Sequence, residues 1–103
     1  MNPVLHGVEV PQAEIERFCE RNQIRKLSLF GSILTERFRR DSDVDVLVEF
    51  EADAAVTYLD LARMEQELST LIGRKVDLRT PQELSRYFRE RVLTEALRQY
   101  ERK

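Results

Sequence analysis

The chain has 103 residues, of which 42% are hydrophobic and 35% charged, and its 17 Lys and Arg against 19 Asp and Glu give a net charge of −2. This balance predicts one globular domain, residues 1–103, located in the cytoplasm, and it excludes nucleic-acid binding through bulk positive charge. One Cys and one His exclude a disulfide framework and a Cys/His zinc site, and no apolar run is long enough to span a membrane.

The first half of the chain predicts a helix and a strand after a short leader. Met1–Val10 is expected to be extended, and Ala13–Arg21 carries apolar residues at helical spacing, among them Cys19 as a small core residue. Ile24–Phe30 has the composition of a strand, which we expect to end at Gly31.

The second half predicts two strands and two helices. Asp43–Phe50 alternates apolar and polar residues as a strand does, and Ala54–Ile72 has a helical apolar stripe that stops at Gly73. Lys75–Arg79 is a short predicted strand, and the capping-box pattern in Thr80–Glu83 predicts a helix from there to the C-terminus. Strands alternating with helices predict an α/β (α+β) fold, a small mixed sheet flanked by helices.

Acidic residues stand two apart at the start of the second predicted strand. Asp43 and Asp45 would project from the same face, where two like charges repel each other unless a cation lies between them. Carboxylate oxygens suit Mg²⁺, and Asp77 in the next strand would join the site if the two strands are neighbours. Three carboxylates are enough to hold two metal ions. The alternative is a solvated strand edge, with Asp77 guarding that edge against pairing.

Gly31 and Ser32 follow the first predicted strand directly. Glycine permits close approach of the backbone to an anion, and a helix beginning near Ser32 would direct N–H groups and a hydroxyl at phosphates. The sequence has neither the GxxxxGK[ST] motif of P-loop NTPases nor the GxSxG motif of a nucleophile elbow. A Gly-Ser pair by itself is more often an ordinary turn.

Together, Gly31-Ser32, the ten residues Ile33–Ser42 and Asp43-Val44-Asp45 resemble the GS-x10-DxD signature of the DNA polymerase β-like nucleotidyltransferase superfamily. At this length the chain resembles its minimal nucleotidyltransferases (MNT), often the antitoxins of HEPN ribonuclease toxins. The resemblance implies the polymerase β-like fold and transfer of AMP from ATP to a tyrosine of a HEPN toxin, which is neutralised as in type VII systems.

The resemblance also implies a role for each motif residue. Asp43 and Asp45 would bind two Mg²⁺ ions, Asp77 would complete the metal site and help to activate the acceptor hydroxyl, and Gly31 and Ser32 would hold the triphosphate. The HEPN toxin is the expected partner, with a second copy of the chain as another source of acceptor surface.

Two other functions stay open. The segment Ile33–Ser42 is bulkier than the small, Arg- and Gly-containing segment of many members, which keeps open a non-catalytic antitoxin that only occludes the toxin. A free-standing small-molecule adenylyltransferase is the other alternative, although such enzymes usually carry an additional helical domain.

Two further groups of residues have a structural and a functional interpretation. A basic cluster near the proposed phosphate site either contacts phosphate or a partner, or is a solvated loop: Arg37, Arg39 and Arg40. Three aromatic residues of the predicted last helix are expected to pack, with a secondary role at an interface: Tyr87, Phe88 and Tyr100.

Overall fold

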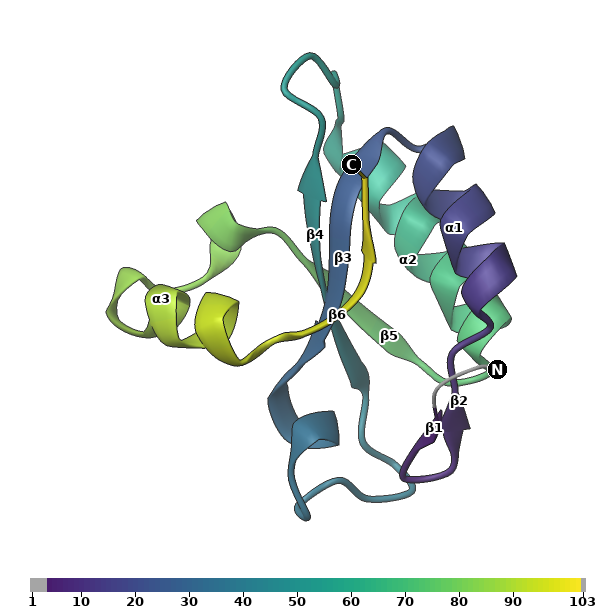
Figure 1. The fold of residues 1–103 in the computed structure, drawn as a ribbon, viewed down its shortest axis with the longest axis vertical. Helices are drawn as coiled ribbons and strands as arrows, with labels where there is room; N and C mark the ends of the chain where they lie inside the picture. Colours follow the sequence, from purple (N-terminus) through teal and green to yellow (C-terminus); the bar gives the residue numbers. More distant parts are fainter. Residues whose placement is uncertain (1–3, 103) are drawn as a thin grey trace.

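The computed structural model describes residues 4–102, which form a four-stranded mixed sheet and three α-helices (Figure 1). The sheet has the order β5-β4-β3-β6, formed by Val76–Arg79, Val44–Phe50, Ile24–Phe30 and Leu97–Glu101. Strand β3 runs antiparallel to both β4 and β6, whereas β4 and β5 are parallel. The predicted α/β class with a small mixed sheet is therefore confirmed.

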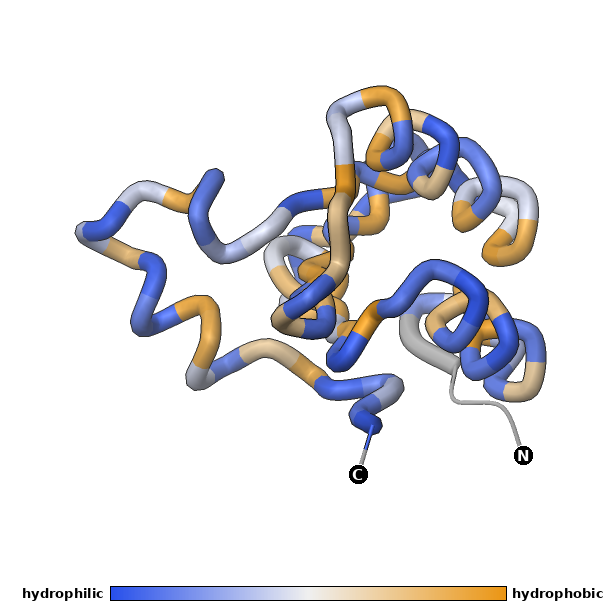
Figure 2. The backbone as a smooth tube through the Cα atoms, turned by 90° about the horizontal axis from the view of Figure 1, so that it is seen from above, coloured by the Kyte–Doolittle hydropathy of each residue, from blue (hydrophilic) through white to orange (hydrophobic). Residues whose placement is uncertain are grey.

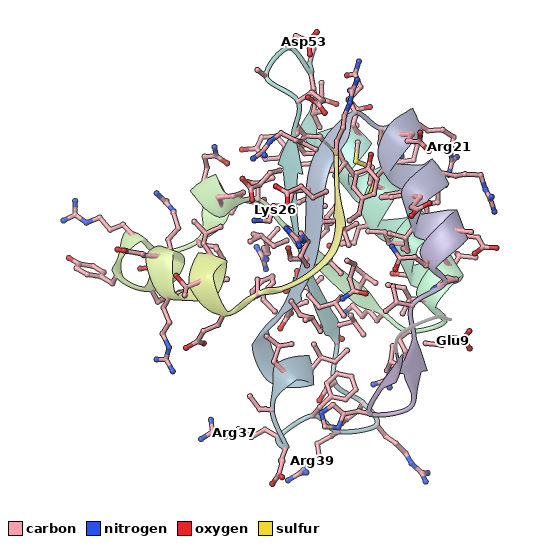
Figure 3. The ribbon with its side chains drawn as sticks, in the orientation of Figure 1. Glu9, Arg21, Lys26, Arg37, Arg39 and Asp53 are labelled. Atoms are coloured by element: carbon pink, nitrogen blue, oxygen red, sulfur yellow. The ribbon has the colours of Figure 1, made fainter. Side chains whose placement is uncertain are left out.

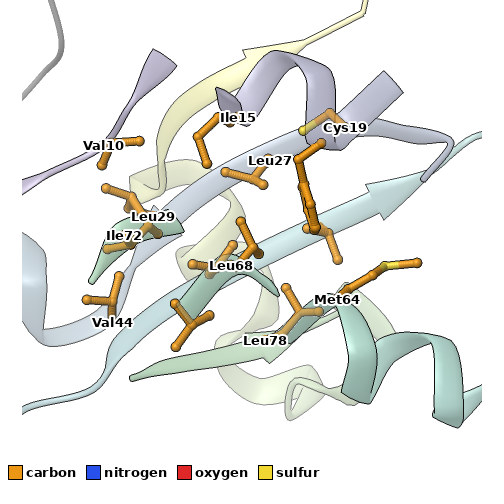
Figure 4. Packing of buried hydrophobic residues seen from close by; sticks show 14 of the residues in the cluster. Val10, Ile15, Cys19, Leu27, Leu29, Val44, Met64, Leu68, Ile72 and Leu78 are labelled. Carbon is orange, nitrogen blue, oxygen red and sulfur yellow. The ribbon is translucent and has the colours of Figure 1, made fainter. Parts of the chain in front are cut away.

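Helices α1 (Gln12–Arg21) and α2 (Tyr58–Ile72) cover one face of the sheet (Figure 1). Their apolar stripes meet alternate residues of the central strands, which produces a single hydrophobic core (Figure 4). Cys19 is fully buried in this core, as predicted.

Helix α2 begins four residues later than the predicted start at Ala54. The hydroxyl of Thr57 accepts a hydrogen bond from the Asp60 N–H, and the Asp60 carboxylate accepts one from the Thr57 N–H. This capping box satisfies N–H groups at the start of the helix, which runs over Tyr58–Ile72, and so fixes where its first turn begins. The helix ends where predicted, because Gly73 adopts φ +77°.

The predicted helix from Thr80 to the C-terminus is wrong. The capping box of Thr80 and Glu83 opens only a 3₁₀ turn, η2 (Pro81–Glu83), and Ser85 then caps a separate helix α3 (Arg86–Glu95). After Ala96, at φ −59° and ψ 139°, the chain becomes strand β6. Pairing with β3 satisfies backbone groups that would otherwise form an open edge, and this long-range gain outweighs local helix preference.

The segment containing η2 and α3 extends away from the opposite face of the sheet and returns as β6 (Figures 1 and 2). No residue of α3 is buried. Tyr87 is 87% exposed and Phe88 49% exposed, so the prediction that these rings pack is wrong; Tyr100, on β6 rather than on a helix, does pack against the core.

At the N-terminal end, the extended leader turns out to be a hairpin, β1 (Val4–Leu5) and β2 (Val8–Glu9), while residues 1–3 of the predicted leader lie outside the described residues. Positive φ at His6 and Gly7 is the conformation that a tight two-residue hairpin turn requires. Within residues 4–102, no helix is long and apolar enough to cross a bilayer.

Candidate functional site

Asp45 is the second residue of β4, an inner strand, and lies on the face of the sheet opposite α1 and α2. Its neighbours Val44 and Val46 are fully buried under these helices, so the alternation of the strand directs Asp45 the other way. In the ladder, Asp45 is paired with Phe30 on β3 and with Asp77 on β5. The site therefore lies on the side of the sheet from which α3 extends.

The charges of two other carboxylates act on Asp45. Burial raises the pKa of Asp45 from 3.8 to about 6, and the negative charges of Asp77 and then Asp43 contribute to this rise, against the opposing effects of Arg79 and of the Ser32 N–H. The parallel register of β4 and β5 is what makes Asp45 and Asp77 direct neighbours. The structure thus brings together the three acids that the sequence analysis singled out.

The Gly-Ser turn lies directly against Asp45. Gly31 has φ +78°, and a side chain there would overlap Oδ2 of Asp45 and stand 3.1 Å from its Cγ. The backbone N–H of Ser32 donates a hydrogen bond to the Asp45 carboxylate. Only glycine permits this close approach of turn and carboxylate. The helix expected near Ser32 is a four-residue 3₁₀ turn, η1 (Gly31–Leu34).

The donor chemistry of these acids suits a hard divalent cation, although in residues 4–102 no group of three or more His, Cys, Asp or Glu side chains is arranged to hold a metal ion. Two of the acids instead form ion pairs with basic residues on β5 or directly before it. Arg79 Nε lies 3.1 Å from Asp77 Oδ1, and Lys75 Nζ lies 3.9 Å from Asp43 Oδ2. Such exposed pairs are worth about 1 kcal/mol or less, so rotating these carboxylates toward a metal costs little.

The loop between η1 and β4 is held in place by Arg74. Its guanidinium donates hydrogen bonds to the carbonyl oxygens of Arg39, Arg40 and Ser42, at 3.1, 2.8 and 2.8 Å. The same guanidinium lies 4.8 Å from the centre of the buried Phe38 ring. This cluster fixes the chain directly before Asp43, a role that sequence reasoning missed because nothing in the local pattern links positions 74 and 42.

The basic residues of this loop do not act as one cluster. Arg39 and Arg40 are exposed and contribute carbonyl oxygens to Arg74, which agrees with the solvated-loop interpretation for these two. Arg37, by contrast, lies on the side of the sheet that faces α3 (Figure 3) and lines the cleft described next.

A cleft of about 810 Å³ runs between the Gly-Ser turn and α3. We call it the Gly-Ser cleft; it is lined from the sheet side by Phe30, Gly31, Ser32, Leu34, Thr35 and Arg37, and from α3 by Phe88, Arg91, Val92 and Glu95. Its volume lies within the range of small-molecule sites. The contribution of α3 was missed from the sequence, although the spacing of its four residues at 88, 91, 92 and 95 is that of one helix face.

Comparison with known proteins places the chain among nucleotide-transferring enzymes. A model of the family described as nucleotidyltransferase domain matches residues 14–99. MJ0435 of Methanocaldococcus jannaschii, provisionally named a protein adenylyltransferase, is 32% identical over 75% of this chain and 81% of its own length. Protein adenylyltransferase MntA of Thermococcus cleftensis is 39% identical over 57% of this chain, a match that spans 58% of that relative and thus less than two thirds of it.

Solved structures share the fold. A structure described provisionally as a minimal nucleotidyltransferase superposes with a TM-score of 0.69 at 36% identity, covering 84% of this chain and 86% of that one. A toxin–antitoxin complex with AMP-PNP gives a TM-score of 0.71 at 22% identity, covering 90% and 75%. The complex of a tri-AMPylated Shewanella oneidensis HEPN toxin with its MNT antitoxin gives 0.63 at 20% identity, covering 88% and 70%.

The last two structures are less than 25% identical to this chain, so they support the fold alone. The family model covers most of the chain, and Gly31 of the GS-x10-DxD motif lies directly against Asp45, which is in register with Asp77. The chain therefore belongs to the nucleotidyltransferase domain family, and its enzymatic class is that of the nucleotidyltransferases.

Proposed function

We propose that this chain is a Mg²⁺-dependent protein adenylyltransferase that transfers AMP from ATP to a tyrosine of a HEPN-type toxin and thereby neutralises it in the cytoplasm, as a type VII-like antitoxin. The observation that carries the proposal is the register of Phe30, Asp45 and Asp77, which joins the Gly-Ser turn to Asp45 and to the carboxylates whose charges raise its pKa. Repulsion at a half-buried position favours binding of divalent cations there.

The proposal assigns a role to each residue of the site. Asp43, Asp45 and Asp77 would hold two Mg²⁺ ions, which would supply positive charge to neutralise the triphosphate and polarise its α-phosphorus. The N–H groups of the Gly31-Ser32 turn would bind phosphate oxygens. The phenol oxygen of the acceptor forms a bond to the α-phosphorus, the bond to the β-phosphate oxygen breaks, pyrophosphate leaves, and Asp77 accepts the phenol proton.

A HEPN-type toxin is proposed as the partner that supplies the acceptor. One face of the sheet is covered by α1 and α2, and the remaining face carries the acids, so residues 1–103 act in this proposal as one domain that presents its site to another protein. Similarity to an MNT antitoxin in complex with an AMPylated HEPN toxin supports that choice.

A second candidate is a binding antitoxin that occludes the toxin without catalysis. The ion pairs of Asp77 with Arg79 and of Asp43 with Lys75 favour it, because they occupy carboxylates that a metal would need. In this case the site would be filled by the protein's own cations.

One experiment distinguishes the two candidates. The purified chain is incubated with α-labelled ATP, Mg²⁺ and a HEPN-type toxin, taken from the neighbouring gene where that gene encodes one. Asp45→Asn is tested in parallel, together with Asp53→Asn, which alters an exposed loop aspartate distant from the site (Figure 3). We expect label on the partner with the wild type and Asp53→Asn only, and loss of that label when the acceptor tyrosine is changed to Phe. A stable complex without label would support occlusion, and label on small molecules alone would contradict both candidates.

A further inference from the structure

The Gly-Ser cleft has a second wall that lies outside the GS-x10-DxD motif. Helix α3 contributes Phe88, Arg91, Val92 and Glu95, which follow one another at intervals of three, one and three residues and so share one helix face. Phe88 remains 49% exposed and no residue of α3 is buried. This face is therefore turned toward the cleft without being packed against the sheet.

The cleft combines the two kinds of groups that a nucleotide needs. Its charged lining residues are Arg37, Arg91 and Glu95, which leaves a net positive charge, and its rings are Phe30 and Phe88. Arginine pairs with phosphate through two parallel N–H donors, and an aromatic ring stacks on a base.

Another cleft, of about 650 Å³, lies at the far end of β4 and has different chemistry. It is lined by Phe50, Val56, Tyr58 and Leu61, among others, and Glu83 is its single charged lining residue. The single negative charge of this cleft disfavours a triphosphate, whereas the net positive charge of the Gly-Ser cleft favours one.

We propose that α3 forms the second wall of the nucleotide site, with Phe88 and Val92 contacting the base and Arg91 contacting the phosphates together with Arg37. The proposal rests on the proposed function, which places the triphosphate at Gly31 and Ser32. It assigns binding and specificity to a helix outside the GS-x10-DxD motif, and it explains why apolar side chains of α3 stay unburied in the chain alone.

Arg91 is free to make this contact at small cost. Its Nε lies 3.2 Å from Oε1 of Glu95 one helical turn away, and both side chains are more than half exposed. Such exposed pairs are weak, whereas a charge-assisted bond to a phosphate is among the strong hydrogen bonds. Binding of the triphosphate would therefore draw Arg91 away from Glu95.

The test measures binding by calorimetry, with Mg²⁺ and a nonhydrolysable ATP analogue, so that it does not depend on turnover. We expect Phe88→Ala and Arg91→Ala each to weaken binding about tenfold. Phe88→Tyr keeps the ring and should bind like the wild type. The matched controls Tyr87→Ala and Arg86→Ala alter the neighbouring, exposed residues of the same helix and should change binding less than about twofold.

Inorganic tripolyphosphate separates the two contacts. Phe88→Ala should leave its affinity unchanged because the base is missing, whereas Arg91→Ala should weaken it about as much as it weakens the ATP analogue. Far-ultraviolet circular dichroism and the melting temperature should match the wild type for all four alanine variants, since no side chain of α3 is buried.

The failures of the two proposals are distinguishable. If the wild type binds the analogue in a Mg²⁺-dependent way that Asp45→Asn abolishes, but Phe88→Ala binds no differently from Tyr87→Ala, the role of α3 is overturned while the catalytic site stands. If the wild type does not bind the analogue with Mg²⁺, the proposed function fails and the role of α3 fails with it.

Discussion

Replacing Asp45 by Asn removes the central negative charge of the site while keeping its shape. The rise of the Asp45 pKa from 3.8 to about 6 means that the folded state disfavours the ionised carboxylate of Asp45. At about 1.4 kcal/mol for each pH unit, this rise corresponds to about 3 kcal/mol. Because Asp45 is only partly buried, screening by water reduces the expected effect on the free energy of unfolding to about 1–2 kcal/mol.

The pH dependence follows from where the proton is bound. Between the ordinary pKa of 3.8 and the folded value of about 6, the folded state retains a proton that the unfolded state has released. Stability therefore falls as the pH rises through this window, and the destabilisation is complete above pH 6. The asparagine side chain of the variant carries no charge at any pH, so wild type and variant should be equally stable below the window and differ most at neutral pH.

Thermal unfolding followed by circular dichroism, in EDTA, measures the difference. At pH 7 the Asp45→Asn variant should melt about 5–10 °C above the wild type. The control Asp53→Asn, on an exposed loop, should melt within about 2 °C of it. Adding Mg²⁺ should raise the melting temperature of the wild type and leave that of Asp45→Asn nearly unchanged. A variant that melts below the wild type at pH 7, or a difference that does not vary with pH, would refute the reasoning.

Three further perturbations test other parts of the structure. Gly31→Ala should lower the free energy of unfolding by about 2 kcal/mol or more, because of the positive φ and the overlap with Asp45. Gly73 has nearly the same φ but lies in open space, so Gly73→Ala should lower it by only about 1 kcal/mol. Equal losses for the two variants in urea unfolding would contradict the close contact between Gly31 and Asp45. Arg74→Ala removes three hydrogen bonds to the loop before β4 and should speed amide hydrogen exchange at residues 39–43, while α2 stays protected. Exchange that rises equally in both segments would indicate general unfolding instead. Burial raises the pKa of the Cys19 thiol to about 12, so this thiol should react with a disulfide reagent only at the rate of unfolding. Fast reaction of the native protein at neutral pH would show that the core around α1 is open.

Much of the fold was predictable because local patterns and tertiary packing agree in it. Helix α1, strands β3, β4 and β5, and most of α2 carry apolar residues at the period of their own secondary structure, and these residues form the core. The exceptions lie where long-range pairing decides. Strand β6 has a helix-compatible sequence and becomes a strand because the edge of β3 is open to it.

The candidate site divides in the same way. The chemistry of the site could be inferred from short segments of the chain: a Gly-Ser pair, two acids at strand spacing and a third acid in another strand. Two features could not be inferred in this way: β5 lies parallel beside β4 with Asp77 in register with Asp45, and α3 lies across the cleft from the Gly-Ser turn. Spacing along the chain specifies which side chains share a face of one element, whereas the register between strands and the position of α3 depend on hydrogen bonds and packing between residues far apart in sequence.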